Sequence, residues 1–242
     1  MSLRAVLFDV YGTLLEIGPA PDDAEALWQG LVASSLGVSA PLSFLAFGAA
    51  CEQSVARRHA LVRSQGIAWP EVDWPSVVAE ALPDFHRLAP AAREAFLLRQ
   101  MRLLRTLRLR AGSGPVLHAL SRTGAALGIV SNAQAYSRRE LADALAPEAL
   151  SLASFDPDLC FWSYQHGFSK PDPHVFRILT ARLEARGIAP HEILMIGDRL
   201  DNDVIPARAH GWRAWHLLSP AQQSGPDSGD WARLLHWLDA TP

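Results

Sequence analysis

The chain has almost no lysine. Of its 242 residues, 22 are lysine or arginine, and a single lysine, Lys170, stands against 21 arginines. Lysine is a compact point charge on a slim stem, whereas arginine is a wide planar fork, so the two are not interchangeable in a small site. Because this chain uses arginine for nearly all of its other positive charges, Lys170 is a candidate site residue.

Cysteine, excess charge and long apolar runs are also scarce. Cys51 and Cys160 are the two cysteines, and their wide spacing does not suggest a disulfide framework or a metal-ligand pair. The net charge of -3 gives no overall attraction for nucleic acid or acidic membranes. The first apolar stretch is too short for a signal peptide or a membrane span. We therefore expect a cytoplasmic protein whose partner is neither nucleic acid nor a membrane.

Three short apolar runs, each followed by a polar residue, indicate strands buried in a parallel sheet. The runs and their following residues are Ala5–Phe8 with Asp9, Leu127–Val130 with Ser131, and Ile193–Ile196 with Asp198. Helical segments are expected after the second and third runs, at residues 135–145 and 203–210. This alternation predicts a doubly wound, mostly parallel, Rossmann-like α/β sheet. Because ligands bind at the carboxyl ends of such strands, we expect the three polar residues to share one site.

The segment between the first two strands has helical periodicity instead. Its predicted helices cover Ala24–Leu36, Ser43–Val62 and Ala91–Leu109. Glycine and proline at residues 18–19 and 112–115 indicate hinges. We therefore predict an all-helical cap domain at residues 17–111, inserted into a core formed by residues 1–16 and 112–242. Four arginines at helical spacing in the third helix predict a solvated stripe: Arg99, Arg102, Arg105 and Arg108.

The polar residues at the strand ends carry plausible chemistry. A carboxylate such as Asp9, followed by a glycine turn at Gly12, can attack an electrophile while backbone amides hold an anion. The alternative for Asp9 is a capping residue. Ser131 and Asn132 combine a hydroxyl with a helix N-terminus, which suits phosphate but also suits a simple helix cap.

Acidic residues gather in the segment that follows the third strand. Asp198 and Asp203 are expected to converge on Asp9, where their charges would repel one another without a cation. Hard oxygen ligands favour magnesium. Asp201 fits better as a turn or capping residue.

Four segments, in order, resemble the motifs of haloacid dehalogenase (HAD) superfamily hydrolases. They are Phe8–Leu15, Ile129–Asn132, Lys170–Pro173 and Gly197–Asp203. The resemblance implies that Asp9 is the nucleophile and that Lys170 neutralises it and the transferring group. It further implies substrate binding by Gly12, Thr13, Ser131 and Asn132. Magnesium would be held by Asp9, Asp198 and the backbone carbonyl of Tyr11, with Asp203 supporting it directly or through water.

Tyr11 departs from the pattern of the family's phosphatases, which carry an acid/base aspartate at this position. A phenol with a pKa near 10 is a poor substitute, so phosphomonoester turnover should be slow. Tyrosine here resembles L-2-haloacid dehalogenases, which need no metal. Those enzymes, however, lack the Gly197-Asp198 pair and carry a tyrosine where this chain has Phe176.

The fourth motif favours a magnesium-dependent hydrolase that acts on a small phosphorylated compound through an aspartyl-phosphate at Asp9. Two alternatives stay open. One is a metal-independent dehalogenase, and the other is a protein that binds a phosphorylated ligand on a weakly active hydrolase scaffold. In each case the partner is a small anion.

Overall fold

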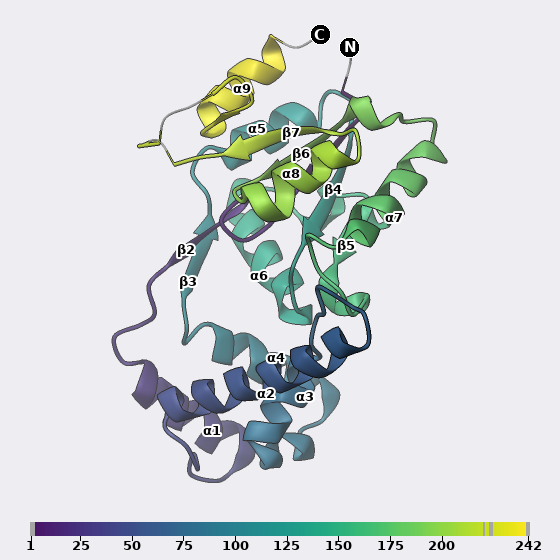
Figure 1. The fold of residues 1–242 in the computed structure, drawn as a ribbon. Coiled ribbons are helices and arrows are strands. Elements are labelled where there is room, and N and C mark those ends of the chain that lie inside the picture. The colour runs from purple at the N-terminus through teal and green to yellow at the C-terminus, as the bar shows by residue number, and fades with distance from the viewer. Residues whose placement is uncertain (1–2, 220, 223–224, 241–242) are drawn as a thin grey trace.

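The core of the protein is a parallel six-stranded sheet (Figure 1). The computed structural model describes residues 3–219, 221–222 and 225–240, so the ends of the predicted core at 1–2 and 241–242 lie outside it. The strands are β1 (Ala5–Phe8), β4 (Ala126–Ser131), β5 (Cys160–Trp162), β6 (Ile193–Gly197), β7 (Arg213–Leu217) and β8 (Ser228–Gly229). Their order is β5-β4-β1-β6-β7-β8, with parallel pairing throughout.

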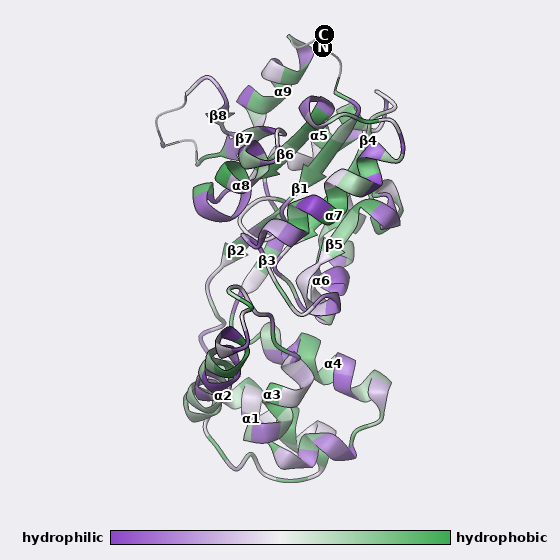
Figure 2. Ribbon diagram, turned by 45° about the vertical axis from the view of Figure 1, so that its right-hand side comes forward, coloured by the Kyte–Doolittle hydropathy of each residue, from purple (hydrophilic) through white to green (hydrophobic). Residues whose placement is uncertain are grey.

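Both faces of the sheet are covered, which explains why its strands are continuous apolar runs. Along β1, Val6 and Phe8 pack into one core cluster, whereas Ala5 and Leu7 pack into another. This alternation follows from the two-residue repeat of a strand. Figure 2 shows the central strands as hydrophobic, while the helices mix both colours. The predicted doubly wound α/β fold is confirmed.

Helices of the core lie on the two faces. One face is covered by α5 (Ser113–Leu120), α6 (Ala135–Leu145) and α9 (Trp231–Asp239), and the other by α7 (Pro173–Glu184) and α8 (Ile205–Ala209). The predicted helix at 203–210 is preceded by a π-helical turn, η7 (Leu200–Val204). Shorter single turns occur at Ala146–Glu148, Leu152–Ser154, Pro157–Leu159, Ser163–Gln165 and Pro190–Glu192.

A helical bundle lies beyond the carboxyl ends of the strands (Figure 1). It consists of α1 (Ala24–Leu36), α2 (Phe44–Ser64), α3 (Trp74–Ala81), the short η1 (Pro83–Arg87) and α4 (Pro90–Met101). Trp28 is fully buried at its centre. Its ring packs in a tilted arrangement against Phe47 at a centroid distance of 4.4 Å, and its Nε1 donates to the Leu42 carbonyl at 2.9 Å. Within the described ranges, no helix combines the length and apolarity needed to cross a membrane.

The predicted helix Ala91–Leu109 is wrong beyond Met101. Residues Thr106–Leu109 form β3, which pairs antiparallel with β2 (Leu15–Gly18) and connects the bundle to the core. The leucines of β3 alternate with more exposed residues, so the pattern that suggests a helix is the two-residue repeat of a ribbon.

The predicted arginine stripe is therefore broken as well. Arg108 lies on the ribbon and pairs with Glu16 of the opposite strand at 2.9 Å. Arg105 points into the protein and pairs with the buried Glu140 at 3.1 Å. The helical repeat ends at α4, so these two arginines do not share a solvated helix face with Arg99.

Truncating the centre of the bundle should destabilise it. We expect Trp28→Ala to lower the free energy of unfolding by about 3–5 kcal/mol, because it removes a buried aromatic and leaves a cavity. Leu45→Ala is a matched control on α2: Leu45 is 84% exposed, and its loss should cost less than about 0.5 kcal/mol. Urea denaturation followed by circular dichroism measures both; equal effects would contradict the packing described.

Candidate active site

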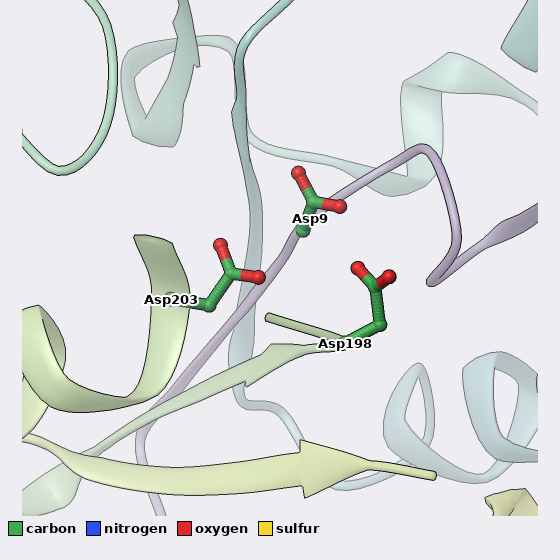
Figure 3. Close-up of side chains that lie close together, drawn as sticks. All are labelled: Asp9, Asp198 and Asp203. Carbon is green, nitrogen blue, oxygen red and sulfur yellow. The ribbon is translucent and has the colours of Figure 1, made fainter. Parts of the chain in front are cut away.

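Three aspartates from separate segments meet at the carboxyl edge of the sheet (Figure 3). Asp9 follows β1, Asp198 follows β6, and Asp203 lies in the π-helical turn after it. One oxygen from each carboxylate lies within 4.8 Å of the other two. The structure thus brings together the three acidic residues that the sequence predicts to converge.

Burial and mutual repulsion make these carboxylates hold protons more tightly than usual. Burial raises the pKa of Asp9 to about 7, and the charge of Asp203 adds to this while Lys170 opposes it. Burial also raises the pKa of Asp198, again with a contribution from Asp203. An all-oxygen donor set of this kind fits a hard divalent cation such as Mg²⁺, which would favour the ionised carboxylates.

Lys170 provides the positive charge inside this cluster. Its ammonium is buried and donates to Asp9 Oδ1 at 2.7 Å and to Asp203 Oδ1 at 2.5 Å. Burial alone would lower the pKa of Lys170, but Asp203 and Asp9 together outweigh it and raise that pKa. Lys170 therefore stays charged and faces the predicted nucleophile.

The side chain of Asn132 fixes the backbone that carries this lysine. The Lys170 N–H donates to Asn132 Oδ1 at 2.7 Å, and Asn132 Nδ2 donates to the Lys170 carbonyl at 2.9 Å. We predicted a substrate contact for Asn132. The contacts that the structure shows for its side chain make it a support for Lys170.

The glycine turn after Asp9 is shaped by Asp198. Gly12 has a φ of +82°, and a Cβ atom there would lie 2.3 Å from Asp198 Oδ2. The buried Thr13 hydroxyl accepts the Asp198 N–H at 3.1 Å and lies 3.2 Å from Asp198 Oδ1. Glycine is therefore required at this turn, and the Thr13 side chain orients Asp198, a candidate metal ligand.

Two polar residues that sequence reasoning missed support the same region. Arg110, at the end of the ribbon, donates to the Gly12 carbonyl, and His216 of β7 lies 3.1 Å from the Asp198 carbonyl. Neither carries a motif signal, because each is distant in sequence from the residue it contacts.

Ser131 has an unused hydroxyl at the end of β4. The residue is completely buried, and its Oγ has no hydrogen-bond partner within the part of the chain that the structure describes. Buried polar groups are almost always paired, so a bound water or ligand is the expected partner of this hydroxyl. An oxygen of a bound anion would satisfy it, in keeping with the predicted role of Ser131.

Tyr11 faces away from this chemistry. Its hydroxyl lies 2.6 Å from Ser137 Oγ and donates to Glu140, both on α6, and the Arg105 guanidinium lies 4.2 Å from the ring centroid. Burial, with the added charge of Glu140, raises the pKa of Tyr11 far above its ordinary value. The phenol therefore keeps its proton and is a poor general acid, and its bonds are to α6 instead of the three aspartates.

Comparison with known proteins agrees with this geometry. The family model for haloacid dehalogenase-like hydrolases matches residues 3–211. No curated protein matches the chain.

Solved structures share the fold at low sequence identity. A 2-haloacid dehalogenase from Pseudomonas syringae pv. Tomato DC3000 is 19% identical, with 99% of this chain and 100% of that one covered and a TM-score of 0.60. A HAD phosphatase from Thermococcus onnurineus is 19% identical, with 97% of each chain covered and a TM-score of 0.52. YfnB from Bacillus subtilis, assigned as a HAD hydrolase and bound to magnesium, is 19% identical over 99% of this chain and 100% of its own, with a TM-score of 0.55. Dehalogenases and phosphatases alike share this architecture, and the chain belongs to the haloacid dehalogenase-like hydrolases.

Proposed function

We propose that the protein is a magnesium-dependent hydrolase of small phosphate monoesters. The observation that carries this proposal is the charge of the buried cluster. Three carboxylates face one ammonium, so the ionised cluster has two negative charges that a divalent cation would balance. Phosphate release from a panel of phosphate esters, with and without Mg²⁺, tests the proposal directly.

In this proposal Asp9 is the nucleophile. Its carboxylate attacks the phosphorus atom, the ester P–O bond breaks, and the alcohol leaves with a proton taken from solvent water. A second water then attacks the aspartyl-phosphate, which regenerates the Asp9 carboxylate and releases inorganic phosphate. Lys170, in contact with Asp9, neutralises charge on the transferring group, and the Ser131 hydroxyl binds one of its oxygens. Asp9, Asp198, Asp203 and the Tyr11 carbonyl would hold Mg²⁺, which supplies further neutralisation of the phosphoryl oxygens when bound.

A second candidate, dehalogenation, is favoured by one observation. Tyr11 stands where L-2-haloacid dehalogenases carry tyrosine, and it offers no proton for a leaving alkoxide. Displacement of halide needs no such proton. Halide release from L-2-chloropropionate that persists in EDTA would support this candidate. Phosphate binding without turnover would instead support the remaining alternative, a ligand-binding role.

Removing one metal ligand should strongly reduce magnesium-dependent turnover. We expect Asp198→Asn to lower the rate about 100-fold or more, because it deletes one charge of the donor set. Asp201→Asn is the matched control: Asp201 belongs to the same segment, but its side chain is 64% exposed and paired with Arg199. The measurement is phosphate release at saturating Mg²⁺; equal losses in the two variants would contradict the assigned metal site.

Magnesium binding should release protons near neutral pH. The pKa of Asp9 is raised to about 7, so below that pH a proton competes with the cation for this carboxylate. We expect the apparent Mg²⁺ affinity to fall as the pH decreases through this range, by up to about tenfold per pH unit. Calorimetric titration in two buffers with different ionisation enthalpies measures the released protons. A binding enthalpy independent of the buffer at pH 6.5 would show that Asp9 is not involved.

A carboxylic acid at position 11 should accelerate the hydrolysis of phosphate esters that have poor leaving groups. We expect Tyr11→Asp to raise turnover of an alkyl phosphate at least about tenfold, since general acid catalysis contributes about 10²- to 10⁴-fold. An aryl phosphate, whose leaving group needs little protonation, should gain much less. Tyr11→Phe, which adds no acid, is the control and should accelerate neither ester. Equal gains for both esters in Tyr11→Asp would argue against a missing acid.

A further inference from the structure

A loop of the cap pairs with the core loop that leads into Lys170. The Glu71 N–H donates to the Gly167 carbonyl at 2.9 Å, and the Ser169 N–H donates to the Trp69 carbonyl at 2.9 Å. Together these bonds form a short antiparallel bridge between cap and core. In Figure 1 this cap loop, between α2 and α3, rises toward the carboxyl edge of the sheet.

The carboxylate of Glu71 also contacts the region of the core around the loop that follows β4. Its Oε1 accepts from Gln134 Nε2 at 3.0 Å, and its Oε2 accepts from the buried Ser163 hydroxyl at 2.5 Å. Ser163 Oγ in turn accepts the Ala133 N–H at 2.8 Å. Ala133 and Gln134 come directly after the Ser131–Asn132 pair, so one cap carboxylate reaches the backbone of the candidate anion site.

Glu71 therefore touches both core loops that the site depends on. One loop directly follows Ser131, the last residue of β4 with its unpaired hydroxyl, and the other carries Lys170; Asn132 already links the two. Removing the Glu71 carboxylate would break the bonds that join Gln134 and Ser163 to the cap loop through this side chain. The Ser163 hydroxyl would be left with the Ala133 carbonyl, 3.1 Å away and within its own core loop, so the side-chain link from the cap to this buried serine would be lost.

We propose that Glu71 is a positioning residue that couples docking of the cap to assembly of the anion-binding site. When the cap loop is docked, the loops bearing Ser131 and Lys170 share one anchor; when it leaves, both lose it. This inference rests on the proposed function only in taking phosphate as the bound anion. The coupling itself concerns backbone positions and can be measured without any substrate.

Asp73→Ala is a control for the alternative that Glu71 only stabilises the cap loop itself. Glu71 also accepts the N–H of Val72 at 2.8 Å, so its loss could simply loosen the cap loop. Asp73 stabilises the same loop from within the cap, since its side chain accepts the Ser76 N–H at 3.1 Å at the start of α3. Asp73→Ala therefore perturbs the loop locally while leaving the Glu71 bonds to the core in place.

Hydrogen exchange at two amides tests the coupling. The Ala133 amide reports on the anion-site loop and the Ser169 amide reports on the docked bridge. In Glu71→Ala, without ligand, we expect both amides to exchange about tenfold faster, which corresponds to the loss of about one buried hydrogen bond. In Asp73→Ala we expect both rates to stay within about twofold of the unsubstituted protein.

Binding of inorganic phosphate provides the functional measurement. With Mg²⁺ present, Glu71→Ala should weaken phosphate binding about tenfold, in step with the faster exchange. Ser163→Ala removes the same link from the core side. In that background, Glu71→Ala should cause much less additional loss, because residues of one hydrogen-bond network are not additive.

The conservative variant separates positioning from charge. In Glu71→Gln the amide keeps one oxygen for Gln134 and can donate its N–H to Ser163 Oγ. The Ser163 hydroxyl can then turn to the Ala133 carbonyl, which lies 3.1 Å away. We expect exchange and phosphate affinity within about threefold of the unsubstituted protein. A Glu71→Gln variant as impaired as Glu71→Ala would overturn the positioning role.

The outcomes distinguish this inference from the proposed function. Unchanged exchange at Ala133 and Ser169 in Glu71→Ala would overturn the coupling, even if phosphate esters are hydrolysed. Coupled exchange in a protein that binds no phosphate would support the coupling and count against the proposed function.

Discussion

A single ammonium buried among carboxylates is the interaction on which the rest of the site depends. Lys170 contacts Asp9 and Asp203 at once, and both contacts lie in the protein interior. Charges buried in this way are tolerated only when they are paired, and one ammonium balances one of the three carboxylates. Burial, together with the remaining negative charge, raises the pKa of Asp9 and of Asp198, and the proposed divalent cation would balance that charge.

The fold serves this arrangement by concentrating strand ends. Parallel pairing of β1 with β4 and β6 places Asp9 between Ser131 and Asp198 at one edge of the sheet. The lysine arrives from a loop, so its position must be fixed by other means. Asn132 fixes it from the core, and the bridge beside Glu71 adds contact from the cap. The loop that carries Lys170 and the loop after β4 therefore hold site residues and also contact the cap.

Sequence reasoning succeeded where the signal is local. Apolar runs ending in Asp9 and Asp198 predict buried strands with polar ends, and the lone lysine indicates the same site. It failed where a contact joins segments distant in the chain. Arg105 has helical spacing relative to its neighbours, yet β2 draws its segment into a ribbon and Glu140 pairs with it. Glu71 belongs to no sequence motif, because its contacts are with core segments that only the fold brings beside it.

The central claim is that Asp9 accepts a phosphoryl group beside a cation held by the buried acidic cluster. A crystal structure determined with Mg²⁺ and beryllium fluoride, an analogue of the aspartyl-phosphate, tests it most directly. We predict a beryllium fluoride adduct on Asp9, Lys170 in contact with it, and the metal bound by Asp9 and Asp198. An acidic cluster without metal and an unmodified Asp9 at saturating concentrations of both reagents would contradict the claim.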